Sequence, residues 1–338
     1  MARAKSQFIC QQCGASYPKW VGKCENCGEW NSLVEQLPVD MGASAVARSS
    51  GKGKALTALR LSETATEAKQ ARLATGIADL DAVLGGGFLP GGVVLVAGQP
   101  GIGKSTLLAQ VAAFIARQKP VLYVSGEESV SQVKLRAERL GAVDSENLQL
   151  ASSNSAEDIA ASIQTGQYNL VIVDSIQTLS LADIASAPGS VSQITNSSNV
   201  IIRAAKASNT AVILVGHVTK EGSIAGPKVL EHLVDVVLNF EGDRYGGFRV
   251  VRAQKNRYGS TNEAAIFEMH EDGLQIVVNP SASLLAERQN LDGSIVLATM
   301  EGARPLLVEI QALVNPTNFG YPKRAASGFD LNRLNLLV

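Results

Sequence analysis

The feature that most constrains this chain is the segment GQPGIGKST at residues 98–106. It fits the pattern G-x-x-x-x-G-K-[ST] and lies between an apolar run, VVLVA, and a helix-like run, TLLAQVAAFIA. In that context the glycines let backbone N–H groups converge on phosphate oxygens at a helix N-terminus. We therefore expect ATP to be held by Gly98, Gln99, Pro100, Gly101, Ile102, Gly103, Lys104, Ser105 and Thr106.

Three side chains of this loop have separate expected roles. Lys104 should reach the β- and γ-phosphates, and the Ser105 hydroxyl should bind Mg²⁺. Thr106 should lie near the α-phosphate. The loop thus predicts binding of a nucleotide with its magnesium ion.

Short runs of Val, Ile and Leu alternate with helix-like segments through the middle of the chain. Such runs are typical of strands buried on both faces, and the intervening segments are long enough for crossover helices. An α/β fold follows, with a mostly parallel sheet covered by helices on both faces. The predicted strands are 93–98, 121–126, 170–174 and 211–216, and the later runs 236–240, 248–254 and 264–269 are expected to extend the sheet in antiparallel fashion.

Polar side chains follow several of these predicted strands. Asp174 ends a strand that we expect beside the P-loop strand, where its carboxylate would hold Mg²⁺; the alternative is a solvent-facing Asp. Glu127 and Glu128 end the next strand, and we favour Glu127 as the base that activates water. His217 ends a further strand, where it could sense the γ-phosphate or simply form a structural hydrogen bond.

Four cysteines lie in two C-x-x-C pairs, each followed by glycine. In a reducing compartment this spacing is typical of a tetrahedral zinc site, with iron or a redox pair as the weaker alternative. We expect Tyr17, Trp20 and Trp30 to cover the site. The module could be a structural clip or could bind nucleic acid. The predicted zinc ligands are Cys10, Cys13, Cys24 and Cys27.

Composition divides the 338 residues into four segments. Residues 1–35 form a zinc ribbon, and residues 36–71 have the Ala, Ser, Gly and Lys content of a flexible linker. Residues 72–278 form the ATPase domain. Residues 279–338 restart the pattern and end on an apolar run whose leucines recur like the start of a core-facing helix. We expect the chain to end inside this last domain; alternatively, the segment packs onto the ATPase domain.

Charge and hydropathy limit the classes of protein. The net charge is −1, so any contact with nucleic acid must come from a local basic surface. No apolar run approaches the ~20 residues needed to cross a bilayer, and the N-terminal segment lacks the apolar core of a secretory signal. We expect a cytoplasmic protein without a membrane partner.

The motifs together resemble the RecA/DnaB/KaiC class of ATPases and, within it, the bacterial RadA (Sms) family. The resemblance rests on the cysteine pairs, TGIADLDAVLGGGFLPG (75–91), GQPGIGKST and KNRYG (255–259), and it covers the whole chain. Tyr258 departs from the Phe that is usual in the family. The resemblance implies a RecA-like fold, with residues 279–338 as the start of a Lon-protease-like α+β domain. It also implies a DNA-dependent ATPase that forms a hexameric ring, binds single-stranded and branched DNA, and promotes branch migration with the RecA recombinase.

The segment KNRYG is the family signature, and its basic residues have two possible roles. Lys255 and Arg257 could reach the γ-phosphate in a neighbouring subunit, or they could contact DNA in the pore. A solvated basic turn is the third interpretation. We expect the whole segment to contact DNA or a neighbouring subunit: Lys255, Asn256, Arg257, Tyr258 and Gly259.

Two Gly- and Ser-rich loops, 180–198 and 217–232, are expected to be mobile and to face the ring axis, the second with Lys220 and Lys228 as DNA contacts. Two other functions remain open at this stage. A KaiC-like regulatory ATPase would gate protein partners and would not need DNA for turnover. A zinc-bearing adaptor would bind ATP without hydrolysing it.

Overall fold

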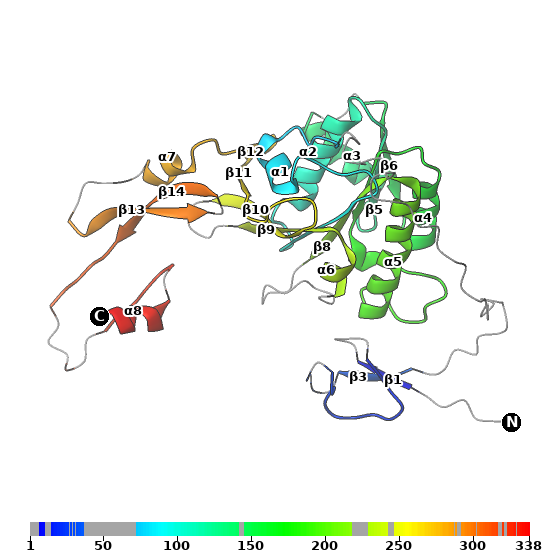
Figure 1. Cartoon of the computed structure of the whole chain (residues 1–338), viewed down its shortest axis with the longest axis horizontal. Helices are drawn as coiled ribbons and strands as arrows, with labels where there is room; N and C mark the ends of the chain where they lie inside the picture. Colours follow the sequence, from blue (N-terminus) through cyan, green and yellow to red (C-terminus); the bar gives the residue numbers. More distant parts are fainter. Residues whose placement is uncertain are drawn as a thin grey trace, which may run out of the picture. The chain divides into compact units, whose positions relative to one another are not determined.

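The structure is a computed structural model of the whole chain (Figure 1). Two compact units can be separated, one of residues 1–278 with 301–304 and one of residues 279–300 with 305–338. Of the predicted linker, residues 37–71 lie outside the described part. The described residues are 7–10, 15–26, 28, 30, 32–36, 72–141, 145–217, 229–242, 247–286, 288, 292–301, 303–316, 320, 323–328 and 330–338.

A nine-stranded sheet is the centre of the first unit, in the order β12-β11-β10-β9-β4-β8-β7-β5-β6. Six neighbouring strands, from β9 to β6, pair in parallel, which confirms the predicted α/β class. The strands are β4 Val93–Gly98, β5 Val121–Ser125, β6 Leu148–Ser152, β7 Leu170–Asp174, β8 Ala211–His217, β9 Val236–Gly242, β10 Phe248–Asn256, β11 Ala264–His270 and β12 Gly273–Ile276.

The sheet corrects three expectations. β7, which ends at Asp174, is not beside the P-loop strand β4, because β8 lies between them. β9 runs parallel to β4, so only β10, β11 and β12 form the antiparallel extension. β6 was not predicted, because its residues are only partly buried and its sequence, LQLAS, lacks a continuous apolar run.

Helices cover both faces of this sheet (Figure 1). Successive strand residues point to opposite faces, so β4 sends Val94 and Val96 into one core and Val93 and Leu95 into the other. The first core is completed by α1 Ala78–Leu84, α2 Lys104–Ala116 and α3 Val130–Arg139; the second by α4 Ala156–Gln164, the 3-10 turn η2 Ile176–Thr178, α5 Val191–Ser208 and α6 Val229–Leu233.

The N-terminal ribbon is a small sheet of β1 Gln7–Cys10, β2 Ser16–Tyr17 and β3 Leu33–Gln36, in the order β2-β1-β3. In the second unit, α7 Pro280–Leu285 precedes the two-stranded sheet of β13 Ser294–Glu301 and β14 Arg304–Gln311, and α8 Leu331–Leu337 follows. The leucine pattern correctly predicted α8. However, that helix buries no residue, so the expected core-facing stripe is not observed. Within the described ranges, no helix is both long and apolar enough to cross a membrane.

Candidate active site

The predicted phosphate-binding loop joins the end of β4 to the start of α2. Gly103 caps the helix with φ of 114°, a conformation that favours glycine, and Lys104 is the first helical residue. Lys104 is only 4% exposed, and its Nζ donates to the carbonyls of Gly98 (2.8 Å) and Gln99 (2.9 Å). Burial lowers the pKa of Lys104, although the charges of Asp174 and Glu127 partly offset this decrease. A buried cation beside a helix N-terminus fits a triphosphate.

His217, at the end of β8, connects Lys104 to Glu127. Its Nδ1 lies 3.2 Å from Lys104 Nζ, and its Nε2 lies 3.4 Å from Glu127 Oε1. Because a charged lysine can only donate, Nδ1 must accept, and the ring proton must then be on Nε2, facing the carboxylate. The histidine therefore lies between the cation expected at the phosphates and the carboxylate expected to activate water.

The two adjacent glutamates point to different partners. Glu127 Oε1 accepts a hydrogen bond from the Ser175 hydroxyl (2.5 Å), just beyond the end of β7. Glu128 instead forms an ion pair with Arg136 of α3. Gly126 makes this turn possible, since a Cβ there would lie 2.1 Å from the hydroxyl oxygen of Thr178. The tertiary structure thus brings Glu127, and not Glu128, to the lysine and the histidine.

Asp174 is buried at the end of β7 and accepts a short hydrogen bond (2.6 Å) from the Tyr123 hydroxyl. Burial raises the pKa of Tyr123 well above its usual value, and Asp174 raises it further, so this hydroxyl stays protonated. Ser105 acts in the opposite direction and lowers the pKa of Tyr123. A serine hydroxyl and a carboxylate are hard oxygen donors of the kind that Mg²⁺ prefers.

The sequence interpretation missed Tyr123 and Ser175. Tyr123 had a signal, because it places a polar hydroxyl between the aliphatic residues of its strand, VLYVS. A buried tyrosine hydroxyl usually needs a partner. Ser175 had no comparable signal, since its contact with Glu127 joins the ends of two strands that are distant in sequence.

The signature segment 255–259 lies at the opposite edge of the sheet from the phosphate-binding loop. Asn256 pairs with Val236, the first residue of β9, which in turn pairs with Val94 near the start of β4. The loop begins at Gly98, at the other end of β4. With about 3.3 Å per strand residue, the length of β4 separates the two sites. Lys255 and Arg257 therefore cannot serve the nucleotide of their own chain.

Within the chain, the two basic side chains of this segment contact the residues that lead from α6 into β9. Lys255 Nζ donates to the carbonyls of Glu231 (2.6 Å) and Val234 (2.7 Å). Arg257 donates to the Asp235 carboxylate (3.1 Å). Burial lowers the pKa of Lys255, and the neighbouring guanidinium of Arg257 lowers it further.

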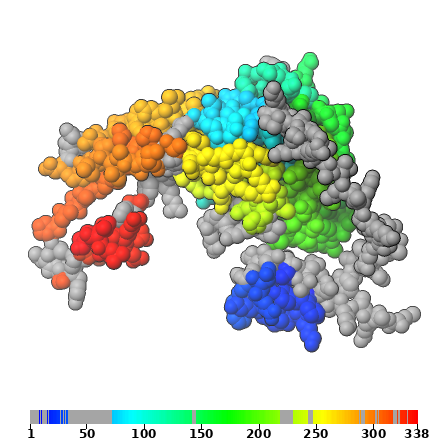
Figure 2. Space-filling view, viewed as in Figure 1, coloured from blue at the N-terminus to red at the C-terminus, as the bar shows by residue number. Residues whose placement is uncertain are grey.

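The other residues of the segment pack against α1. Asn256 donates to the carbonyl of Val83 (3.0 Å), and a Cβ on Gly259 would lie 2.9 Å from the Cα of Gly85. A Cβ on Gly85 would in turn meet the carbonyl oxygen of Tyr258 at 2.9 Å. In Figure 2 the cyan surface of α1 borders the yellow surface of this part of the sheet. Asn256, Tyr258 and Gly259 therefore have structural roles inside the chain.

Within the described residues, the first predicted loop, 180–198, is not the mobile loop that was expected. The second half of 180–198 is helical, because α5 begins at Val191. The first half is held by the buried side chain of Gln193, which accepts from Leu181 N (2.9 Å) and donates to the carbonyls of Ile184 (2.8 Å) and Ser186 (3.0 Å). In the second loop, Lys220 and Lys228 lie outside the described residues.

In the ribbon, Cys10 and Cys24 come from the two predicted pairs and are both buried in one small cluster with Leu33. Gly28 N donates to Cys24 O (2.8 Å) and has φ of 77°, as expected for a tight metal-binding turn. The described residues fit a metal ion, although Cys13 and Cys27 lie outside the described part.

The aromatic residues of the ribbon do not all cover the cysteines as expected. The Tyr17 hydroxyl lies 3.3 Å from Cys24 Sγ, but Trp20 and Trp30 are 53% and 67% exposed. Lys23 packs over the Trp30 ring at 5.6 Å. The two tryptophans thus form part of the ribbon surface.

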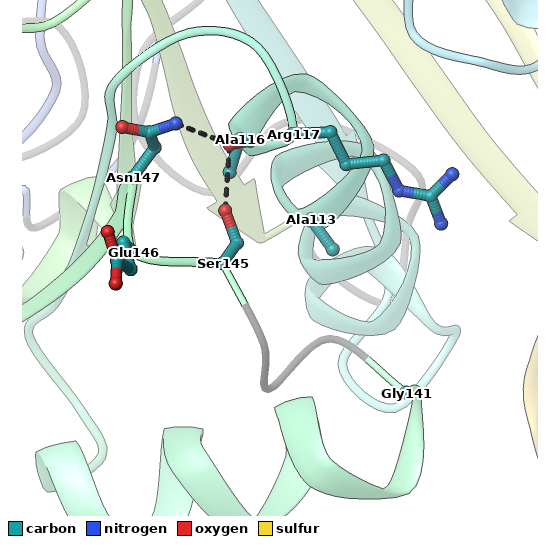
Figure 3. Close-up of a pocket in the computed structure, with 7 residues that line it drawn as sticks. All are labelled: Ala113, Ala116, Arg117, Gly141, Ser145, Glu146 and Asn147. Carbon is teal, nitrogen blue, oxygen red and sulfur yellow. Dashed lines mark hydrogen bonds between the residues drawn. The ribbon is translucent and has the colours of Figure 1, made fainter.

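A pocket of about 560 Å³ lies at the C-terminal end of α2 and is distinct from the nucleotide site (Figure 3). Ser145 and Asn147 both donate to the carbonyl of Ala116 at its wall, at 2.7 and 3.0 Å. Lys104 is at the other end of the same helix, which rises about 1.5 Å per residue. The lining residues are Ala113, Ala116, Arg117, Gly141, Ser145, Glu146 and Asn147.

Comparisons with known proteins identify the family of this chain. A family model described as AAA domain matches residues 56–223, and one described as Rubredoxin metal binding domain matches residues 8–35. The DNA repair protein RadA of Bacillus subtilis is 50% identical over 346 residues, covering 100% of this chain and 74% of that protein. The DNA repair protein RadA of Pseudomonas aeruginosa is 47% identical over 339 residues, with the same shares covered. One solved structure, the RadB recombinase, matches with a TM-score of 0.46 and 25% identity, covering 61% of this chain and 99% of that one.

Proposed function

The chain belongs to the RadA family of DNA repair proteins, and we propose that it is a DNA-dependent ATPase that acts as a ring in homologous recombination. In this proposal the ring is a hexamer in the cytoplasm. It binds single-stranded and branched DNA and promotes branch migration with the RecA recombinase. The observation that carries the proposal is the position of Lys255 and Arg257, because they are too far from the phosphate-binding loop of their own chain to act there.

The side chains around the loop support hydrolysis of ATP by water. Lys104 would exchange its two carbonyl partners for the β- and γ-phosphates. Glu127 would accept a proton from the attacking water. The water oxygen would bond to the γ-phosphorus while the bond between that phosphorus and the ADP oxygen breaks. His217 contacts both residues, so the position of its ring would change with the phosphate that Lys104 holds.

Two metal ions belong to the proposal. Ser105 and Asp174 would hold Mg²⁺, which neutralises charge on the phosphates when bound. Tyr123 orients the Asp174 carboxylate for that purpose. In the ribbon, Cys10, Cys13, Cys24 and Cys27 would hold Zn²⁺, whose binding would supply most of the folding free energy of so small a module.

A second subunit would complete the site. Lys255 and Arg257 of one chain would approach the γ-phosphate held by the next chain, where a cation stabilises the charge that develops in phosphoryl transfer. The competing role of the same cations is contact with DNA phosphates, and we place Lys220 and Lys228 in that role as well. ATP hydrolysis would then depend on assembly of the ring. When the ring assembles on DNA, hydrolysis would be coupled to movement along the DNA.

The test is an ATPase titration of the intact protein with and without single-stranded DNA at two salt concentrations. We expect DNA to stimulate turnover, and we expect higher salt to weaken the stimulation, because contacts with the DNA backbone release counterions. The Lys104→Ala variant should lose turnover with or without DNA. Turnover that DNA does not change would contradict the proposal and would favour a regulatory ATPase that gates protein partners.

A further inference from the structure

Asp235 is a buried carboxylate that does not belong to the nucleotide site of its own chain. Its side chain is 4% exposed and lies between α6 and the start of β9. Oδ1 accepts from Arg257 Nη1 (3.1 Å) and faces Lys206 Nζ (3.5 Å), while Oδ2 accepts from the backbone N–H of Val93 (3.1 Å). Asp235 also helps to raise the pKa of the Tyr258 phenol. The carboxylate therefore has donors from three separate parts of the chain, namely α5, the start of β4 and the signature segment.

Because Asp235 is buried, its carboxylate requires the ion pair with Arg257. A carboxylate removed from water must keep its donors, because an unpaired buried charge is strongly unfavourable. Arg257 by contrast is 51% exposed, and an exposed arginine on a solvated turn would otherwise sample many rotamers. The fixed carboxylate thus restricts the guanidinium, and the backbone N–H of Arg257 also donates to the Asp235 carbonyl (3.1 Å).

Asp235 also attaches this segment to the strand that carries the phosphate-binding loop. Its backbone N–H donates to Val93 O (3.0 Å), and its side chain accepts from Val93 N, so both polar groups of Val93 are bonded to one residue. Val93 begins β4, and Gly98 ends the same strand at the loop. The position of Arg257 is therefore tied to the rigid central strand rather than to a surface turn.

From this geometry we infer that Asp235 is a positioning residue, which holds Arg257 where it can serve the nucleotide of the adjoining subunit. The inference rests on the proposed function, in which Arg257 acts between subunits. Asp235 touches no reacting atom; it acts through the guanidinium. Lys255 differs in this respect, since its ammonium group donates to the backbone carbonyls of Glu231 and Val234.

The Asp235→Asn variant separates the two tasks of this carboxylate. The amide oxygen can still accept from Val93 N, whereas the amide nitrogen can only donate and so cannot hold a guanidinium. We expect the turnover number to fall about 100-fold, as for other small misplacements of an acting group, while the affinity for ATP stays unchanged. The matched control is Lys206→Ala, which removes an exposed cation from the same carboxylate but leaves Arg257 in place; its turnover should stay close to that of the unmodified protein.

Subunit mixing gives a readout that a purely structural role would not produce. Asp235→Asn leaves the phosphate-binding loop intact, and Lys104→Ala leaves Arg257 correctly held. When the slowed Asp235→Asn variant and the inactive Lys104→Ala variant are mixed and allowed to exchange subunits, sites between them combine an intact loop with a correctly held arginine. We expect turnover about 10-fold above that of Asp235→Asn alone. Absence of recovery in mixed rings would overturn the inference.

Arg257→Ala distinguishes failure of this inference from failure of the proposed function. If Arg257→Ala turns over normally, the action of Arg257 between subunits is wrong and the inference falls with it. If Arg257→Ala is impaired but Asp235→Asn is not, only the inference is wrong. The double variant should be no slower than Arg257→Ala alone, because both changes remove one interaction. Should Asp235→Asn fail to fold, Asp235→Glu takes its place, since it keeps the charge and displaces the carboxylate by about 1.5 Å. The same fall in turnover and the same recovery on mixing are expected of Asp235→Glu.

Discussion

At the scale of single residues, the nucleotide site depends on a lysine whose donors are already in use. Lys104 bonds to two carbonyls of its own loop and to His217, so phosphates must displace these partners. Since His217 also faces Glu127, release of its Nδ1 would free the ring to turn toward a phosphate. Glu127 and Glu128 have different partners, so variants of the two residues can test whether Glu127 is the base of this site.

We expect Glu127→Gln to lower turnover by about 100- to 10,000-fold and to leave ATP binding intact, because the amide cannot accept the proton of the attacking water. Single-turnover hydrolysis and a separate binding measurement with a fluorescent ATP analogue would show this. Glu128→Gln is the matched control, since Glu128 pairs with Arg136 away from the loop. Equal losses in the two variants would show that the choice between the glutamates is wrong.

Tyr258 should give the protein an alkaline instability. Burial raises its pKa to about 12 from 10.0, and Asp235 contributes. The folded state therefore holds the phenolic proton more tightly than the unfolded chain, so this stabilisation is complete below pH 10.0 and is lost as the pH rises toward about 12. Tyr258→Phe, which introduces the residue usual in the family, should reduce that loss.

Urea denaturation of both proteins on the two sides of pH 10.0 would check the sign. Tyr123 is present in both proteins, so its own titration cancels in the comparison. The prediction fails if the stability of both proteins declines equally with rising pH.

At the scale of elements, the segment before α5 is held by one side chain from the helix itself. Gln193 is buried and bonds to four backbone groups of the segment that follows η2. The start of the segment is also held by a bridge between Ser180 and Ser155, whereas Ile184 and Ser186 depend on the bonds to Gln193.

Gln193→Ala should lower the free energy of unfolding by about 2 kcal/mol, because buried backbone groups lose their partners. It should also make residues 181–190 more sensitive to limited proteolysis. Gln164→Ala, at the exposed end of α4, is the control and should leave both properties unchanged. Unchanged proteolysis of the Gln193 variant would show that other contacts hold the segment.

Removal of metal should unfold the ribbon and leave the ATPase domain intact. The chain has four cysteines and two tryptophans, and all of them lie within residues 1–35. Thiol titration and tryptophan fluorescence therefore report on the ribbon alone. A strong chelator should make all thiols reactive and should alter the contact between Lys23 and Trp30, while ATP binding persists. Fully reactive thiols before chelation would argue against a bound metal.

At the scale of the whole molecule, the sheet separates two groups of cations that the proposed chemistry needs together. The loop lies at the carboxyl ends of the parallel strands, and Lys255 and Arg257 lie at the opposite edge. A repeating head-to-tail contact between subunits can bring these two edges together, and such contacts form a ring when the rotation between neighbours closes.

Turnover per subunit should accordingly fall on dilution, because a dissociated subunit lacks the cations of its neighbour. ATP binding per subunit should fall less, since the loop belongs to one chain. Activity and binding measured over a dilution series, with mass measured by light scattering, would test this. Constant turnover per subunit through the dissociation of the ring would contradict action between subunits.

The sequence by itself determined the four continuous apolar strands and the local motifs. These parallel strands are confirmed because continuous apolar runs are typical of strands buried on both faces of a covered sheet. The predicted phosphate-binding loop has the strand and helix expected around it, because its function depends on contiguous residues whose backbone geometry is set locally.

Only the tertiary structure decided which distant side chains meet. The insertion of β8 between β4 and β7 depends on how crossovers pack, which periodicity does not encode. The contacts of Tyr123 with Asp174, of His217 with Glu127, and of Asp235 with Arg257 join residues that are 22 or more positions apart. Such pairs depend on strand order and register, which are set by packing of the whole sheet rather than by any local segment.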